Sequence, residues 1–200
     1  MKIVTVIGAR PQFIKAAPVS RVLRNVHDEI LIHTGQHYDA NMSDIFFEEL
    51  HMPKPDYHLG IGSGPHGKQT GEMLSGIEEI LLKEKPDHLL VYGDTNSTLA
   101  GALAAAKLHI PVIHVEAGLR SFNKKMPEEI NRIMTDHVSN FLFCPTDTAV
   151  ENLKRENIRK NVYNVGDVMF DAVEYNREIA KSSTVLERLK LDEKAYHLIT

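Results

Sequence analysis

The sequence has 200 residues, of which 42% are hydrophobic and 25% are charged, and its 23 basic and 27 acidic residues give a formal net charge of −4. This composition is typical of a globular protein, and it excludes the basic excess on which nucleic-acid binding depends. The sequence contains no apolar run near the roughly 20 residues of a membrane-spanning helix, and its single cysteine, Cys144, excludes a disulfide framework and a cysteine-rich zinc site.

Short apolar runs alternate with helical patterns along the chain. In chain order we expect a strand at 2–7, a helix at 13–25, a strand at 29–33, and helices at 41–50 and 66–85. The pattern continues with a strand at 88–92, a helix at 95–108, a strand at 111–116, a helix at 127–138, a strand at 141–144, a helix at 147–156, a strand at 162–165 and a helix at 167–180. Strands that alternate with helices form a parallel sheet covered on both faces. We therefore predict an α/β fold over residues 1–180, with a doubly wound, Rossmann-like parallel sheet.

The last 20 residues do not fit this alternation. Residues 181–194 are polar and charged, as in a linker helix, and residues 196–200 begin a pattern typical of a strand. A single terminal strand has no partner of its own. We therefore expect residues 181–200 to be a linker and the first strand of a C-terminal domain, and a strand that joins the existing sheet is the alternative.

Cationic residues follow the first predicted strand, at the edge where doubly wound sheets bind ligands. Arg10 comes directly after the strand, and Lys15 lies in the predicted first turn of the next helix, where free backbone N–H groups favour anions. Together they suit a diphosphate, because a guanidinium is planar and bidentate whereas an ammonium is a compact charge. The alternative is a capping arginine and a solvated lysine.

Carboxylates follow other predicted strands. Glu116 ends the strand at 111–116, where a carboxylate is partly removed from water and is costly unless it is paired or functional. Asp94 follows the strand at 88–92, although aspartate is also a favoured helix N-cap. Glu128 lies in the first turn of its helix, where it suits the helix dipole or pairs with Arg132 four residues on. The carboxyl edge of the sheet is thus expected to carry cations on one side of a crevice and carboxylates on the other. This arrangement suits the binding of an anionic small molecule and acid/base chemistry on it.

Two further patterns concern the core and metal binding. We expect His114 to be a core histidine with satisfied ring nitrogens, and we expect the apolar side of helix 127–138 to carry Ile130, Ile133, Met134 and Val138. The segment at 62–67 matches G-x-G-x-x-G, but its proline is unsuited to a tight dinucleotide-binding turn. The histidines form no H-E-x-x-H motif and no cluster with cysteine, so we expect no metal site within the chain.

Five segments follow one another in a specific order: GARPQFIK at 8–15, GQH at 35–37, YGDTNST at 92–98, HVEAGLRS at 114–121 and MPEEINR at 126–132. Together they resemble the N-terminal domain of the non-hydrolysing UDP-N-acetylglucosamine 2-epimerase family, over essentially the whole chain. The resemblance implies a glycosyltransferase-B arrangement of two Rossmann-like domains with the active site in the cleft between them. It also implies a family histidine of that site beyond residue 200.

The resemblance further implies a reaction. UDP leaves C1 of UDP-N-acetylglucosamine to give a 2-acetamidoglucal, and its re-addition with a proton on the other face of C2 gives UDP-N-acetylmannosamine. This chemistry needs acid and base groups near C2 and stabilisation of the leaving group, but no cofactor. By resemblance, the catalytic carboxylates are Asp94, Glu116 and Glu128, and the substrate-binding residues are Arg10, Lys15 and Arg132.

Two features bear on the substrate. Some bacterial relatives bind a second, activating UDP-sugar through a glutamine where this chain has Asp39, which argues against such activation here. The segments at 8–15 and 93–98 also resemble the branch that acts on UDP-2,3-diacetamido-2,3-dideoxyglucuronate, which is the second candidate substrate. Two further hypotheses are a glycosyltransferase of the same architecture and a non-catalytic UDP-sugar-binding module.

The expected partners are a UDP-sugar, the C-terminal domain of the same protein and, as in many family members, a second copy in a homodimer. We expect no nucleic-acid or membrane partner. The 200-residue chain alone is expected to be almost inactive, because the second domain supplies much of the nucleotide site. Met1 leads into the first strand without the flanks of a signal peptide, so we expect the protein to be cytoplasmic.

Overall fold

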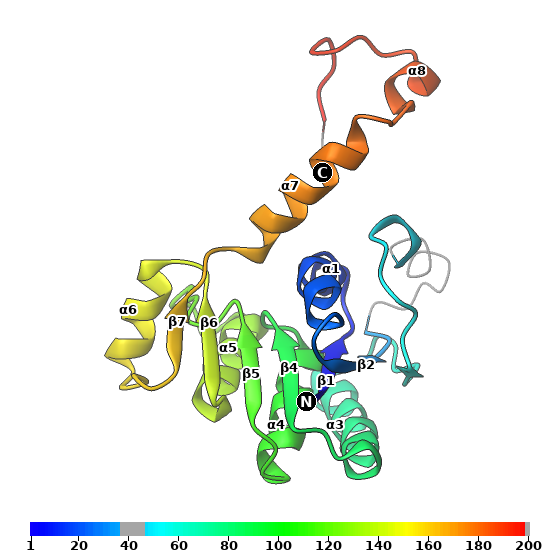
Figure 1. Cartoon of the computed structure of the whole chain (residues 1–200). Coiled ribbons are helices and arrows are strands. Elements are labelled where there is room, and N and C mark those ends of the chain that lie inside the picture. Colours follow the sequence, from blue (N-terminus) through cyan, green and yellow to red (C-terminus); the bar gives the residue numbers. More distant parts are fainter. Residues whose placement is uncertain (37–46, 199–200) are drawn as a thin grey trace.

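The computed structural model describes residues 1–36 and 47–198, and within them the chain folds around one parallel β-sheet. Its strands are β1 (Lys2–Ile7), β2 (Asp28–His33), β3 (Tyr57–His58), β4 (His88–Tyr92), β5 (Val112–Val115), β6 (Phe141–Cys144) and β7 (Val162–Asn164). They lie in the order β3-β2-β1-β4-β5-β6-β7, and every neighbouring pair is parallel (Figure 1). The strand order reverses between β1 and β4, which is where open α/β sheets bind their ligands.

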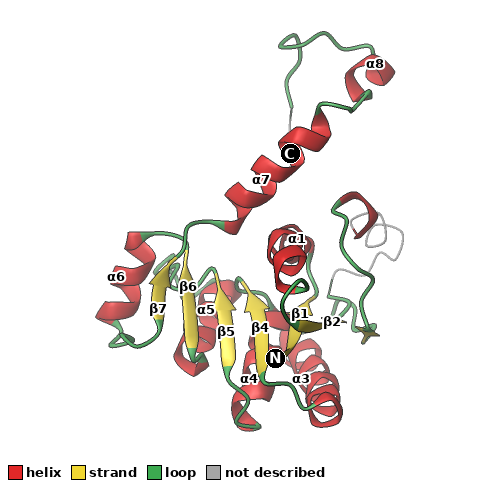
Figure 2. Cartoon of the chain, viewed as in Figure 1, coloured by secondary structure: helices red, strands yellow, loops and turns green. Residues whose placement is uncertain are grey.

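Helices cover both faces of this sheet. They are α1 (Arg10–Leu23), α3 (His66–Glu84), α4 (Asn96–Lys107), α5 (Pro127–Val138), α6 (Asp147–Arg155), α7 (Val168–Ala180) and α8 (Val185–Leu189). α3, α4 and α5 pack side by side on one face, and α1 lies on the other, where α7 packs against it (Figure 2). Among the described helices, none combines the length and apolar character needed to cross a bilayer.

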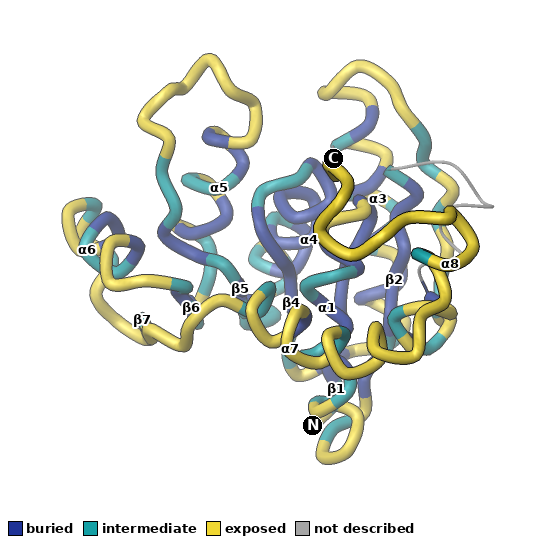
Figure 3. The backbone as a smooth tube through the Cα atoms, turned by 90° about the horizontal axis from the view of Figure 1, so that it is seen from above, coloured by how far each residue is buried: buried dark blue, intermediate teal, exposed yellow. Residues whose placement is uncertain are grey.

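Buried apolar side chains fill both faces of the sheet. β4 is buried from Leu89 to Tyr92, as expected of a central strand between two helical layers. α4 approaches the sheet closely because its buried positions are mostly small residues, and a Cβ at Gly101 would lie 3.3 Å from Val91 Cγ1. Figure 3 shows buried residues concentrated in the strands and inner helices, whereas α7 and α8 are largely exposed.

The predicted α/β fold is confirmed, and the ranges predicted for β1, β4, α5 and β6 agree with the structure residue for residue. α1 begins at Arg10 rather than at residue 13, with proline in its first turn, and it continues through Pro18. β5 ends at Val115, so Glu116 lies outside the strand, in left-handed backbone with φ of 72°. Asp39 and residues 41–46 of a predicted helix lie outside the described residues.

The C-terminal segment is helical only in part. α8 occupies part of the predicted linker, and residues 196–198 belong to no strand in the described chain. The division of the chain at residue 180, with a C-terminal domain after it, stays a prediction.

Candidate functional site

A buried glutamine joins the loops that follow β1 and β4. Gln12 Oε1 accepts hydrogen bonds from the backbone N–H of Gly8 (2.9 Å) and Ala9 (3.0 Å). Its Nε2 donates to the carbonyl of Tyr92 and to Thr98 Oγ1, both at 3.0 Å. One side chain therefore ties the two loops together at the point where the strand order reverses.

An ion pair lies between α1 and the loop after β5. Lys15 Nζ donates to Glu116 Oε2, and the two side chains are 15% and 18% exposed. Both border Gly93, because a Cβ there would lie 3.1 Å from Glu116 Oε2 and 3.5 Å from Lys15 Nζ. The partial burial expected of the Glu116 carboxylate is confirmed. Lys15 lies in the second turn of α1 rather than in the first, because the helix begins at Arg10.

The backbone at Glu116 is held in an unusual conformation. Glu116 has φ of 72°, in the left-handed region that non-glycine residues rarely adopt, whereas Gly93, with φ of 62°, adopts this region readily. Such conformations persist only where the surroundings enforce them, and they concentrate at functional sites.

A second ion pair holds Asp94. Arg132 Nη2 donates to Asp94 Oδ2, and Arg132 Nη1 donates to Glu129 Oε2 at 3.1 Å. The N-cap of α4 is Thr95, whose hydroxyl accepts from the N–H of Thr98. Asp94 is therefore not the helix cap that its position suggested, and its carboxylate faces an arginine instead.

Glu129 fixes the orientation of that arginine. Its carboxylate is 1% exposed and accepts the backbone N–H groups of Ser121 (2.9 Å) and Phe122 (2.8 Å). Burial alone would raise the pKa of Glu129, but these two hydrogen bonds and the charge of Arg132 outweigh it and hold the pKa below its usual value. The ionised side chain therefore anchors both Arg132 and the loop that leads into α5.

Glu128 and Arg10 are exposed at the same edge of the sheet. Glu128 lies in the first turn of α5 and has no ion pair with a described residue, so the alternative pairing with Arg132 is not formed. Arg10 is the first residue of α1. The six predicted site residues thus divide into two buried or half-buried ion pairs and two exposed side chains.

The buried face of α5 is mostly polar. Val138 packs against the core as predicted, but the prediction is wrong for Ile130 and Met134. Ile130 and Met134 are 45% and 42% exposed, whereas the buried residues are Glu129, Asn131, Thr135 and Asp136. Asn131 Nδ2 donates to the carbonyl of Asp94 (2.9 Å) and to Asn96 Oδ1 (3.1 Å). Polar groups can occupy this face because they bind the site loops instead of an apolar core.

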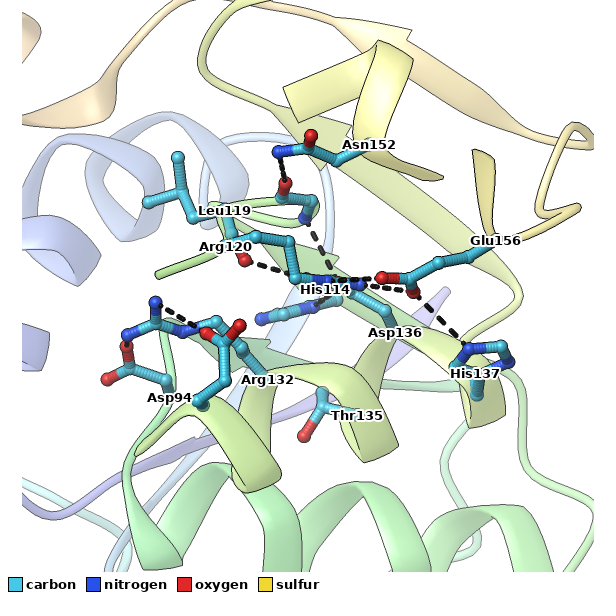
Figure 4. A network of polar contacts seen from close by, with 12 residues as sticks. Asp94, His114, Leu119, Arg120, Arg132, Thr135, Asp136, His137, Asn152 and Glu156 are labelled. Atoms are coloured by element: carbon cyan, nitrogen blue, oxygen red, sulfur yellow. Dashed lines mark hydrogen bonds and ion pairs between the residues drawn. The ribbon is translucent and has the colours of Figure 1, made fainter. Parts of the chain in front are cut away.

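A buried polar network lies next to the site (Figure 4). Asp136 Oδ1 is 2.7 Å from His114 Nδ1, and Asp136 Oδ2 accepts from the N–H of Gly118 (3.1 Å) and from Arg120 Nη1 (2.7 Å). Arg120 also binds both carboxylate oxygens of Glu156, each at 2.7 Å. The prediction that His114 is a core histidine with polar partners is confirmed.

Comparison with known proteins decides which family this site belongs to. The family model described as UDP-N-acetylglucosamine 2-epimerase matches residues 22–200. The chain belongs to this family. The resemblance read from the sequence is thereby confirmed, together with the fold that it implied, one Rossmann-like half of a glycosyltransferase-B-type architecture.

Individual UDP-N-acetylglucosamine 2-epimerases are close in sequence and structure. A Methanococcus maripaludis homologue of the epimerase is 62% identical over the whole chain and 57% of its own length. The Pseudomonas aeruginosa UDP-2,3-diacetamido-2,3-dideoxy-D-glucuronate 2-epimerase is 61% identical over 91% of this chain and 53% of its own. The crystal structure of the Methanocaldococcus jannaschii epimerase with UDP-GlcNAc and UDP has a TM-score of 0.91 and 53% identity, over 94% of this chain and 53% of that one. The chain spans about half the length of these relatives.

Sequence reasoning missed several residues that organise this epimerase-family site. Gln12, Glu129, Asn131 and Asp136 are polar side chains between 1% and 6% exposed. All but Asp136 lie inside the segments on which the family resemblance rests. Their burial could not be predicted from the sequence, because polar residues are expected at the surface. For Gln12 and Glu129 the available signal was the third position of a helix, from which a glutamine or glutamate side chain reaches back to preceding backbone N–H groups.

The close approach of the loops gives a prediction for stability. A Cβ at Gly8 would lie 2.0 Å from Thr34 Oγ1 and 2.3 Å from Ser97 Oγ, whose mutual hydrogen bond is 2.8 Å long. Gly8→Ala is therefore expected to lower the free energy of unfolding by about 1–3 kcal/mol, as measured by urea titration. Gly71→Ala is the control, because Gly71 lies within α3 with open space around it, and it is expected to raise stability by about 0.5–1 kcal/mol. Equal stabilities for the two variants would contradict the prediction.

Proposed function

We propose that this chain forms one half of an enzyme that inverts C2 of a UDP-N-acetylhexosamine and interconverts UDP-N-acetylglucosamine and UDP-N-acetylmannosamine. The observation that carries the proposal is the pairing of two carboxylates with two cations around Gly93. Glu116 pairs with Lys15, and Asp94 pairs with Arg132, at the edge of the sheet where the strand order reverses. Membership of the UDP-N-acetylglucosamine 2-epimerase family supports the same function.

The reaction accounts for this combination of charges. The C2 proton of the sugar is not next to a carbonyl, so its direct removal is difficult. In an elimination, a base takes the C2 proton, the C2–H electrons form the C1=C2 bond, and UDP leaves C1 with the electrons of the C1–O bond. UDP then adds back to C1 while an acid delivers a proton to the opposite face of C2.

The proposed roles follow from the positions of the side chains. Asp94, Glu116 and Glu128 are proposed to exchange protons with the sugar and the leaving group, since a positioned acid or base contributes typically about 10²–10⁴-fold in rate. Arg10, Lys15 and Arg132 are proposed to bind the substrate, with Arg10 at the start of α1 facing the diphosphate. No metal or organic cofactor enters this scheme.

Exchange of the C2 proton with solvent tests the function. Proton NMR of UDP-N-acetylglucosamine in D₂O would be recorded with the 200-residue chain and with a chimera in which the remaining C-terminal part of the M. maripaludis relative follows residue 200. We expect loss of the C2 proton signal with the chimera and almost none with the chain alone, because the chain spans 57% of that relative. A chimera that binds UDP without any exchange would contradict the epimerase and favour a binding module.

The diacetamido-glucuronate sugar is a second candidate substrate, favoured by the 61% identity to the P. aeruginosa enzyme. The same chimera assayed with both sugars decides between them. Faster exchange at C2 of UDP-2,3-diacetamido-2,3-dideoxyglucuronate would assign that substrate, and exchange restricted to UDP-N-acetylglucosamine would exclude it. Transfer of the sugar to an acceptor without C2 exchange would identify a glycosyltransferase.

A binding measurement tests the role of Arg10. Arg10→Ala in the chimera is expected to weaken UDP binding about 10- to 100-fold in isothermal titration calorimetry, because a charged hydrogen bond is worth about 1.5–3 kcal/mol. Arg155→Ala is the control, since Arg155 lies on α6 with a side chain that is 68% exposed. An unchanged dissociation constant for Arg10→Ala would place Arg10 outside the nucleotide site.

A further inference from the structure

His114 lies at the junction between the buried network and the site. Its ring is fully buried in β5, and each ring nitrogen has one partner at 2.7 Å. Nε2 faces the carbonyl oxygen of Gly93, which can only accept a hydrogen bond, so Nε2 must carry a proton. Nδ1 faces Oδ1 of Asp136, and the charge of that carboxyl group decides whether Nδ1 also carries one.

The surroundings of Asp136 favour a carboxylate. Its second oxygen already accepts from the N–H of Gly118 and from Arg120. These two fixed donors, one of them a guanidinium, favour the ionised carboxylate over its protonated form at this buried position. An ionised Asp136 leaves Nδ1 as a donor, so both nitrogens of His114 are protonated.

A count of charges agrees with this state. The groups around His114 and Asp136 are Arg120 from the loop after β5, Glu156 from the end of α6 and the Cys144 thiol from β6. Burial raises the pKa of Cys144 to about 12, so the thiol is neutral. Two carboxylates, one guanidinium and one imidazolium sum to zero, whereas with a neutral His114 the buried Asp136 would share Arg120, its only cation among the described residues, with Glu156. His137 contacts only the outer, half-exposed end of this network, through Glu156.

Gly93 connects His114 to both catalytic ion pairs. Its N–H donates to the carbonyl of Val115 (3.0 Å) and its carbonyl accepts from His114, so β5 holds both of its polar atoms. Asp94 is the next residue, and a Cβ on Gly93 would lie 3.1 Å from Glu116 Oε2. Movement of this one peptide would therefore displace Asp94 and open the space beside Glu116.

We propose that His114 is a positioning residue, a doubly protonated imidazolium that holds the Gly93 carbonyl and thereby sets the positions of Asp94 and Glu116. The effect on catalysis rests on the proposed function. The charge state of His114 and its restraint of the Gly93 turn do not depend on the proposed function, and each can be measured without catalysis.

Two substitutions of His114 separate its two contacts. In His114→Gln the side-chain amide lies near the position of Nε2 and keeps a donor toward Gly93. In His114→Asn the amide lies near the position of Nδ1 and keeps a donor toward Asp136. His88→Gln is the control, because His88 opens the neighbouring strand β4 at the opposite end of the sheet and its buried Nδ1 has no polar partner among the described residues.

In the chimera, we expect His114→Asn to lower kcat about 10²-fold with little change in KM, because small misplacements of catalytic groups have effects of this size. His114→Gln is expected to keep most of the activity, and His88→Gln is expected to keep all of it. A purely structural role predicts instead that kcat follows the unfolding free energies of the variants. Equal kcat for His114→Asn and wild type, or equal loss in His114→Asn and His114→Gln, would overturn the proposal.

NMR tests the proposal without any turnover. In the ¹⁵N-histidine-labelled chain, the His114 signals, assigned by their absence from His114→Gln, should show a directly bonded proton on both ring nitrogens, because each nitrogen faces an acceptor oxygen. The amides of Gly93 and Asp94 should exchange with D₂O faster in His114→Asn than in wild type or His88→Gln. A single ring proton, or unchanged amide exchange, would overturn the proposal. If the wild-type chimera exchanged no C2 proton, the proposed function would be wrong. The ring protons of His114 and the exchange of the Gly93 and Asp94 amides would still test the role of His114.

Discussion

Glu116→Gln in the chimera is expected to lower kcat by about 10²–10⁴-fold, which is the usual contribution of a positioned acid or base. The amide has the same size as the carboxylate but can neither take nor deliver the C2 proton. It also loses the charge that holds the ammonium of Lys15 in place. Because the substitution changes few contacts of the fold, binding of UDP and the free energy of unfolding should change much less than kcat.

A matched carboxylate outside the site controls for this change. Glu151 lies on α6 with a side chain that is 47% exposed, and Glu151→Gln is expected to leave the rate unchanged. C2 proton exchange followed by NMR gives the rate of both variants. A Glu116→Gln variant with the wild-type rate would remove Glu116 from the mechanism, and Asp94→Asn would then test the remaining buried pair.

Arg120→Met is expected to lower the free energy of unfolding by about 3–5 kcal/mol, the usual effect of removing one partner of a buried ion pair. The guanidinium is 1% exposed and binds both Asp136 and Glu156. Its removal takes from the buried Asp136 the guanidinium that it contacts and leaves it His114 and the Gly118 N–H, and the methionine side chain restores only the packing. Lys154→Met is the control, because its pair with Glu151 is exposed and worth less than about 1 kcal/mol.

The pH dependence of the same variant gives an independent check. The pKa of Asp136 is lower in the folded chain than in the unfolded chain, so its stabilising contribution is complete above the unfolded value, near 4. The contribution is lost as the pH falls through the folded value. Removal of Arg120 raises the folded value and brings it closer to the unfolded one, so urea titrations should show the variant losing less stability than wild type as the pH falls below about 4. Parallel pH profiles for the two proteins would contradict the ionised state of Asp136.

The strands of this fold could be predicted because they are short, apolar and regularly separated by helices. The limits of β1, β4 and β6 follow from that pattern alone. The buried face of α5 could not be predicted from the same pattern. Apolar periodicity points to Ile130 and Met134, whereas the residues that are buried include Asn131 and Asp136, which form hydrogen bonds. Apolar periodicity predicts packing against an apolar core, whereas Glu129 and Asn131 of this helix bind the loops before α5 and after β4 through hydrogen bonds.

The candidate site was predictable to a similar degree. Strand ends identified Asp94 and Glu116, because parallel strands bring the loops at their carboxyl ends to one edge. The family resemblance, rather than position, singled out Glu128, which the structure leaves exposed. Gln12 was missed because the predicted helix began only at residue 13, and Glu129 was missed because its bonds to Ser121 and Phe122 depend on the path of the preceding loop.

The four hydrogen bonds of Gln12 have a mechanical consequence. The loops after β1 and β4 cannot shift independently, because each displacement would strand a buried donor or acceptor, at about 1–3 kcal/mol for each group. The backbone that carries Lys15 and Asp94 is therefore held as one rigid unit by a single side chain. Under the proposed function, we expect substrate entry and product release to depend on movement of parts of the enzyme outside this unit.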